Sequence, residues 1–178
     1  MTGRVIALVT VAALLILAGC GGAGVPAPSS PPASPESVVT GFVFAYGPHQ
    51  PKNVLDTPRG TFTKDMILAS SITVPFSLSD DELARIFRRI VAIDFWSYPS
   101  RYVSRGDGRW FEPPAGMQYE TRLTVVTEQG SKTVRWSGGF HADDRRAQDL
   151  RDVAALIRRI IESIAEYKRL PPAEGGYL

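Results

Sequence analysis

Residues 79–91 read SDDELARIFRRIV and predict the best-defined helix of this chain. Ser79 and Glu82 have the spacing of a capping box, in which each side chain accepts a hydrogen bond from the other residue's backbone. Five apolar residues recur at helical spacing and form one face: Leu83, Ile86, Phe87, Ile90 and Val91. We expect an amphipathic helix that ends near Asp94 and buries this face.

The residues before this helix predict strands. Residues 41–46 carry aromatic side chains at alternate positions, which is typical of a strand with one aromatic face. Residues 53–56 and 60–66 flank the sequence TPRG at 57–60. Proline at the second position and glycine at the fourth favour a type I turn, so these two segments predict a hairpin.

Three further segments also show the alternation of a strand. Residues 72–78 alternate, and Pro75 lacks a backbone N–H, so we expect this strand at a sheet edge or at a bulge. Residues 119–125 and 134–136 alternate too, and the sequence EQGS at 128–131 between them predicts a short hairpin loop.

A second helix is expected near the end of the chain. Asp143 or Asp144 would begin it, and the sequence Leu170-Pro171-Pro172 would end it. Its inward face would consist of apolar residues at helical spacing: Leu150, Val153, Ala154, Ile157, Ile160, Ile161 and Ile164.

The order of these elements predicts the fold class. Strands and helices are grouped rather than strictly alternating, which favours an α+β domain. We expect an antiparallel sheet of about five strands with two amphipathic helices packed on one face. Residues 38–178 would form this single domain, which is large enough to fold alone.

The composition excludes several classes of protein. The chain has 178 residues with 20 basic and 18 acidic side chains, a balance that argues against nucleic acid as a partner. One cysteine excludes a disulfide framework, and one cysteine with two histidines excludes the usual structural zinc sites. No metal and no dissociable cofactor is expected.

The N-terminal residues 1–20 read MTGRVIALVTVAALLILAGC and predict a secretory signal. Arg4 precedes an uncharged run that is shorter than the roughly 20 apolar residues needed to span a bilayer. Leu17-Ala18-Gly19-Cys20 resembles the lipobox of bacterial lipoproteins. An ordinary signal with an incidental cysteine, or an uncleaved anchor, is the alternative.

The lipobox resemblance implies a location as well as a modification. It implies removal of signal peptide 1–19 and attachment of a diacylglyceryl group to Cys20, with a further acyl chain such as palmitate. Residues 20–37 are rich in proline, serine and glycine and predict an extended tether. We therefore expect a cell-envelope protein, membrane-anchored through its N-terminal lipid and facing outside the cytoplasm.

The domain itself resembles small uncharacterised bacterial lipoproteins and domains of unknown function. The residues that carry this resemblance lie at 55–57, 60–66, 93–99 and 166–171, where the sequence reads LDT, GTFTKDM, IDFWSYP and EYKRLP. The resemblance spans most of the domain and supports its boundary and fold, but it implies no particular chemistry.

The segment 97–117 is the most suggestive for binding. It is long for a loop, yet rich in aromatic and arginine side chains, a combination suited to anionic and apolar contacts. The candidate binding residues are Trp96, Tyr98, Arg101, Tyr102, Arg105, Arg109 and Trp110. The alternative is a lid that folds over the core, with its arginine stems packed flat.

Four other residues suggest a different chemistry. Asp56, Asp65, Asp94 and His141 could form a catalytic or cation-binding cluster if the fold brought them together. The alternative is that the aspartates hold turns and element ends, and that Asp143 or Asp144 caps a helix.

No catalytic motif is recognisable in the chain, which lacks the GxSxG, HExxH and P-loop patterns. We therefore expect a non-enzymatic binding or accessory domain that contacts an envelope protein or an anionic polymer. An envelope hydrolase or a cation-binding domain built on the Asp/His set is the alternative.

Overall fold

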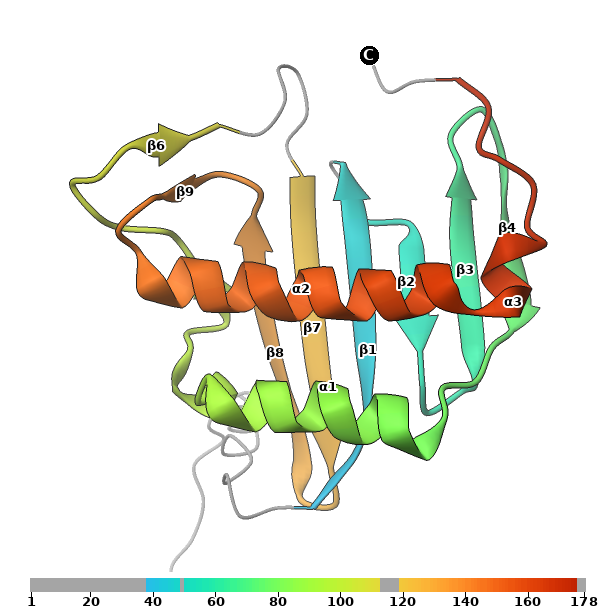
Figure 1. Cartoon of the computed structure of the whole chain (residues 1–178), viewed down its shortest axis with the longest axis horizontal. Helices are drawn as coiled ribbons and strands as arrows, with labels where there is room; N and C mark the ends of the chain where they lie inside the picture. The colour runs from blue at the N-terminus through green and yellow to red at the C-terminus, as the bar shows by residue number, and fades with distance from the viewer. Residues whose placement is uncertain (1–37, 49, 113–118, 176–178) are drawn as a thin grey trace, which may run out of the picture.

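A computed structural model describes residues 38–48, 50–112 and 119–175. Four strands come first in the chain: β1 (Val39–Pro48), β2 (Asn53–Asp56), β3 (Thr61–Met66) and β4 (Ala69–Pro75). Helix α1 (Asp80–Ala92), the short 3-10 helix η1 (Phe95–Ser97) and strands β5 (Arg101–Tyr102) and β6 (Trp110–Phe111) follow. The last elements are β7 (Tyr119–Thr127), β8 (Gly130–Ser137), β9 (Phe140–His141), α2 (Arg145–Ser163) and α3 (Ala165–Lys168) (Figure 1).

The α+β class is confirmed, with a mainly antiparallel sheet. The main sheet has the strand order β4-β3-β2-β1-β7-β8-β5, and β6 pairs separately with β9. Among the named strands of the described ranges, only β5 runs parallel to its neighbour. The expectation of about five strands is too low, because β5, β6 and β9 have two residues each and carry no alternation that a sequence could reveal. The edge position expected from Pro75 is confirmed, since β4 is an outer strand.

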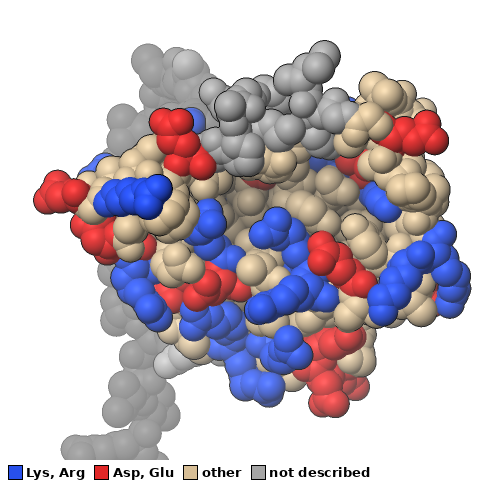
Figure 2. All heavy atoms as spheres, turned by 45° about the horizontal axis from the view of Figure 1, so that its top comes forward, with Lys and Arg blue, Asp and Glu red and all other residues tan. Residues whose placement is uncertain are grey.

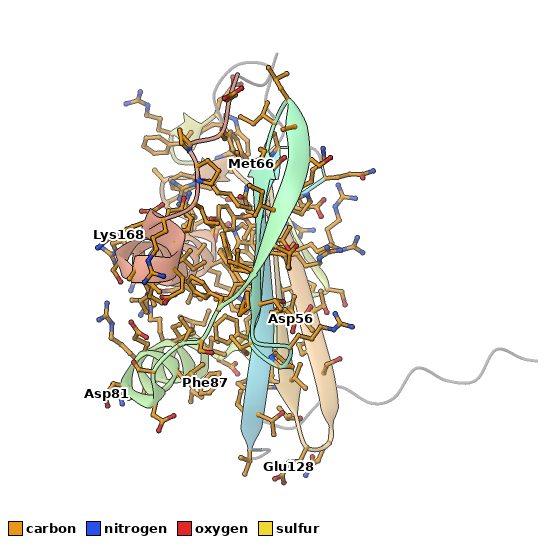
Figure 3. All side chains as sticks on the ribbon, turned by 90° about the vertical axis from the view of Figure 1, so that its right-hand side faces the viewer. Asp56, Met66, Asp81, Phe87, Glu128 and Lys168 are labelled. Atoms are coloured by element: carbon orange, nitrogen blue, oxygen red, sulfur yellow. The ribbon has the colours of Figure 1, made fainter. Side chains whose placement is uncertain are left out.

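The core lies between the sheet and the helices, both of which lie on the same side of the sheet (Figure 3). One row of direct cross-strand partners runs through its centre. Its members are fully buried and come from five adjacent strands: Phe62, Leu55, Phe44, Leu123 and Val134. Apolar burial of this kind is the main stabilising contribution to such a layer.

Helix α1 begins as the sequence predicts. The Ser79 side chain accepts from the Glu82 backbone at 3.4 Å, and the Glu82 carboxylate accepts from the Ser79 backbone at 2.8 Å. Ile86 and Ile90 are buried on the inward face. The prediction is wrong for Val91, which is 56% exposed because it lies at the flank of the inward stripe, one residue round the helix from Ile90.

Helix α2 begins after Asp144, as expected, but ends earlier than Leu170. Ile164 takes an extended conformation after Ser163, and α3 follows as a separate turn. This break redirects the chain so that Tyr167 packs against Phe62, with ring centroids 5.6 Å apart.

Two expectations about the N-terminal part concern residues that are not described. The predicted signal 1–19 and the lipidated Cys20 with its tether 20–37 lie outside the described residues. Within the described ranges, no helix has both the length and the apolar character needed to cross a membrane.

The different environments of Ile90 and Val91 give a test of the layer arrangement. We expect Ile90→Ala to lower the free energy of unfolding by about 2–5 kcal/mol, because it leaves a cavity in the core. Val91→Ala should change it by less than about 0.5 kcal/mol, because that side chain is largely exposed. Urea unfolding of the full chain measures both values, and equal losses would contradict the orientation of α1.

Candidate functional site

The segment after α1 is tied to the start of α2 by one buried carboxylate. Asp144 is only 7% exposed and caps α2 by accepting from the Ala147 backbone at 3.0 Å. It also accepts from the Tyr102 hydroxyl at 2.7 Å and the Ser104 hydroxyl at 2.8 Å. A fourth bond comes from the Arg105 backbone at 2.8 Å. One side chain therefore fixes β5 and the following loop to the helix N-terminus.

These bonds set the ionisation of Asp144. Burial raises its pKa, but the four donors named above outweigh burial and lower the pKa from 3.8 to about 2. The adjacent Asp143 accepts from the Asp107 backbone at 3.0 Å, and this bond lowers the pKa of Asp143 below its ordinary value. Gly106 and Gly108 lie so close to the Asp143 carboxylate that a Cβ at either would collide with it. The pair of aspartates thus holds the loop from 104 to 108.

Three of the seven candidate binding residues pack inside the domain. Tyr98 is 2% exposed, and its hydroxyl donates to the Arg146 carbonyl at 3.1 Å. Tyr102 is held by Asp144 and packs edge-on against Tyr98, with centroids 5.3 Å apart. Trp96 packs against Phe95 at 6.1 Å. These aromatic residues form a cover over the core, as the lid alternative describes.

The other four candidates lie on β5, on β6 and in the segment between these two strands. Arg101 lies on β5 and is exposed, as are Arg105 and Arg109 in and after the loop. Trp110 is 42% exposed on β6 and packs on His141 at 4.9 Å. The seven residues therefore do not form one continuous surface. Residues 113–117 of the predicted binding segment lie outside the described residues.

A broad hollow lies on the helix-facing side of the sheet, beside α2. Its volume is about 600 Å³. Its floor contains Tyr46, Thr121 and Trp136, which are direct cross-strand partners on β1, β7 and β8. We call this hollow the groove. In Figure 2 the surface is hollowed between flanking lobes, with basic side chains along its lower rim.

Two elements wall the groove. The β6–β9 ribbon contributes Phe111 and Phe140, whose rings stack with centroids 4.9 Å apart. Helix α2 contributes small and polar side chains and two arginines: Gln148, Arg151, Asp152, Ala154, Ala155 and Arg158. Aromatic planes beside charged and amide groups are typical of a binding site rather than of a bare packing defect.

The two arginines of the groove differ in their partners. Arg151 donates to the Gly138 carbonyl at 2.9 Å, and its guanidinium lies 3.9 Å from the centre of the Phe140 ring. Burial lowers the pKa of Arg151, which nevertheless stays cationic. Arg158 is exposed and makes no hydrogen bond or ion pair with any described residue. It is the cation of the groove that is available to a ligand.

Sequence reasoning missed this groove, although part of its signal was present. Arg151 and Arg158 are seven residues apart and so share one side of a helix. Tyr46 and Trp136 each lie two residues beyond a core residue, Phe44 and Val134, and so continue the core-facing side of strands that the sequence did predict. The pairing of β1, β7 and β8 that brings these residues together could not be read from spacing alone.

The Asp/His set is not brought together. Asp56 accepts from the Arg59 backbone and guanidinium, both at 3.0 Å, as a turn residue does. Asp56 pairs with Thr61 in the sheet, so Asp65, four residues further along β3, lies about 13 Å away.

The two remaining members of the set lie elsewhere in the fold. Asp94 follows α1 in a left-handed conformation, and His141 lies on β9 (Figure 1). Over the described ranges, no group of three or more His, Cys, Asp or Glu residues is placed to hold a metal ion. The four residues therefore share no site on which a catalytic step could be built.

The low pKa of Asp144 predicts an acid-sensitive fold. A carboxyl whose pKa falls from 3.8 to about 2 on folding contributes on the order of 2 kcal/mol at neutral pH. This contribution is complete above about pH 4 and is lost as the pH falls through about 2. We expect Asp144→Asn to lower the free energy of unfolding by about 2 kcal/mol at pH 7 and to flatten its decline between pH 4 and pH 2.

Glu128→Gln is the matched control, because it removes one carboxylate from the exposed β7–β8 hairpin tip. Urea unfolding at several pH values measures both variants. A pH dependence in Asp144→Asn equal to that of the unmodified chain would contradict the role of Asp144.

Comparison with known proteins adds nothing to this geometry. No family model, curated protein or solved structure matches the chain. The candidate site is therefore the groove beside α2, as the side chains of this chain define it.

Proposed function

We propose that this protein is a non-enzymatic binding domain, anchored by lipid outside the cytoplasmic membrane, that holds a partner protein in the groove. The observation that carries this proposal is the combination of an aromatic floor with the unpartnered cation of Arg158. Such a surface suits a partner segment that offers both apolar and acidic side chains. An envelope protein with an exposed acidic and aromatic segment meets this requirement.

Three described carboxylates that do not line the groove hold the fold together. Asp56 holds a turn, Asp144 caps a helix, and Asp149 pairs with Arg89 at 2.9 Å. Each is occupied in holding the fold. Catalysis by acid and base would need two such groups free and within hydrogen-bond reach of one substrate.

The groove is also built to keep its shape. Its β6–β9 wall is held by the stacked Phe111–Phe140 pair and by Arg151, which bonds to Gly138 and covers the Phe140 ring. Tyr46 lies in the floor, and burial raises the pKa of its phenol, so it stays neutral and keeps its proton to donate. A preformed surface loses less entropy on binding than one that must order itself.

The anchor part of the proposal rests on Leu17-Ala18-Gly19-Cys20. Cys20 is the single thiol of the chain, so no other residue competes for a thioether-linked lipid. A diacylglyceryl group brings two acyl chains, which give stable membrane attachment where one chain does not. The proline-rich segment 20–37 would then hold the domain away from the bilayer.

The groove is tested by a charge reversal with a neighbouring control. A photo-crosslinking amino acid at Ala155, which lines the groove, should yield a discrete protein adduct in cells. We expect Arg158→Glu to reduce the adduct about tenfold, because the groove then repels an acidic segment. Arg159→Glu makes the same charge change on an exposed residue that does not line the groove, and it should leave the yield unchanged. No adduct, or equal losses in both variants, would refute the proposal.

The lipid anchor is tested separately. We expect Cys20→Ser to remove the lipid mass from the mature protein and to shift it from the membrane fraction to the soluble fraction. Ser29→Ala, in the tether, should leave both properties unchanged. A Cys20→Ser protein that stays in the membrane fraction with an unaltered mass would exclude lipidation at this residue.

A further inference from the structure

Three arginines form a row across the sheet. Arg101 on β5 is the direct cross-strand partner of Arg135 on β8, and Arg135 is the direct partner of Arg122 on β7. All three are exposed. None makes an ion pair or a hydrogen bond through its guanidinium with a described residue. We call these residues the arginine row.

The row lies on the face of the sheet that the helices do not cover. Arg122 precedes the buried Leu123, and Arg135 lies between the buried Val134 and Trp136. Because neighbouring side chains of a strand point to opposite faces, both arginines point away from the core. Figure 3 shows this open face on the side of the sheet opposite the helices. The groove opens on the other face of the sheet, where Tyr46, Thr121 and Trp136 form its floor.

The arginine row is expected to destabilise the folded domain when no ligand is bound. Adjacent strands lie about 4.8 Å apart, so the backbone positions of the three arginines span about 10 Å. Like charges directly opposite each other in a sheet are destabilising. Glu120, two residues from Arg122 on the same strand, makes no ion pair with any of the three. The row therefore presents three guanidinium groups that form no ion pair with a described acidic residue.

A recess adjoins the row. It has a volume of about 300 Å³, and its lining includes Arg101, Arg135 and Glu120. Three further lining residues also line the groove: Tyr119, Trp136 and Ser137. The guanidinium groups provide planar sets of donors that match the oxygens of phosphate and carboxylate groups. The Ser137 hydroxyl adds a further donor at the rim. A single anionic group fits the recess, while the row extends beyond it to Arg122.

We propose that the open face of the sheet binds an anionic polymer through the arginine row, with the chain crossing β7, β8 and β5. A length of about 10 Å accommodates more than one oxyanion group, which favours a chain over a single ion. The recess favours a flexible chain over a bilayer, because a chain can place one group between Arg101 and Arg135 and another on Arg122. This site goes beyond the groove, because none of the three arginines of the row lines the groove.

The test uses the full chain and two polymers of known chemistry, linear polyphosphate and polygalacturonate. The variant Arg101→Ala/Arg122→Ala/Arg135→Ala removes the row. The control Arg85→Ala/Arg88→Ala/Arg159→Ala removes three exposed arginines of the helix layer, so both variants lose the same net charge. Inorganic phosphate and vesicles of phosphatidylcholine with phosphatidylglycerol serve as the alternative ligands.

We expect the row variant to bind at least one of the polymers about tenfold more weakly or worse, and with a flatter salt dependence. The control variant should stay within about twofold of the unmodified chain. The row variant should still unfold cooperatively in urea, because its three exposed positions lie outside the buried core.

Four outcomes would overturn the proposal. The first is that neither polymer binds. The second is that both variants bind equally more weakly, which would show that polymer binding depends on net charge and not on the position of the arginines. The third is binding of inorganic phosphate as tightly as of the chains, which would indicate a single-ion site. The fourth is dependence on the row for vesicles alone, which would assign the face to a membrane surface.

Discussion

The hydrogen bonds that converge on Asp144 are the constraint on which the rest of this domain depends. One carboxylate caps α2 and at the same time receives Tyr102, Ser104 and the Arg105 backbone. It thereby fixes β5 and the start of the following loop to the N-terminus of α2. Strand β5 has only two residues, so these bonds add to its short pairing with β8, and the loop that they hold leads on to β6 in the groove wall. Loss of this carboxylate would therefore loosen the edge of the sheet and the groove together.

Strand alternation then divides the molecule into two surfaces of different chemistry. On β8, Trp136 points to the groove while Arg135 points to the open face, and on β7 Thr121 and Arg122 divide in the same way. A shift of one residue in register would exchange the two sets and place arginines in the core. The buried row that runs from Phe62 to Val134 excludes such a shift, because its members are all fully buried. Packing of the core thus fixes both candidate binding surfaces without either surface contributing to it.

The parts of this structure that the sequence predicts are those with local causes. The capping box at Ser79, the hairpin around Pro58 and the edge strand at Pro75 each depend on residues a few positions apart, and each is found. The strands β5, β6 and β9 could not be predicted, because two residues show no alternation and their partners lie about thirty positions away or more. The candidate functional residues could not be grouped correctly from the sequence for the same reason, because long-range pairing decides which of them lie together. Arg101 was recognised as a candidate, but Arg122 and Arg135 join it only through long-range pairing, and the carboxylates that looked like a set are separated by the register of β2 and β3.

The arginine row also shows why net charge is a weak guide to partners. Twenty basic and 18 acidic side chains nearly cancel, which argues against a protein that binds polyanions by its overall charge. A net charge near zero for the whole chain does not mean that each positive side chain has a negative one beside it. Arg59 and Arg89 are neutralised by Asp56, Asp149 and Asp152, whereas the three arginines of the row are not neutralised by any described acid. Since attraction between exposed charges is screened within about 8 Å at physiological salt, a polymer lying on the row would respond to these three charges and hardly to the acids of the helix layer. A balanced composition is therefore compatible with a local polyanion site, provided that the fold aligns like charges and pairs the rest elsewhere.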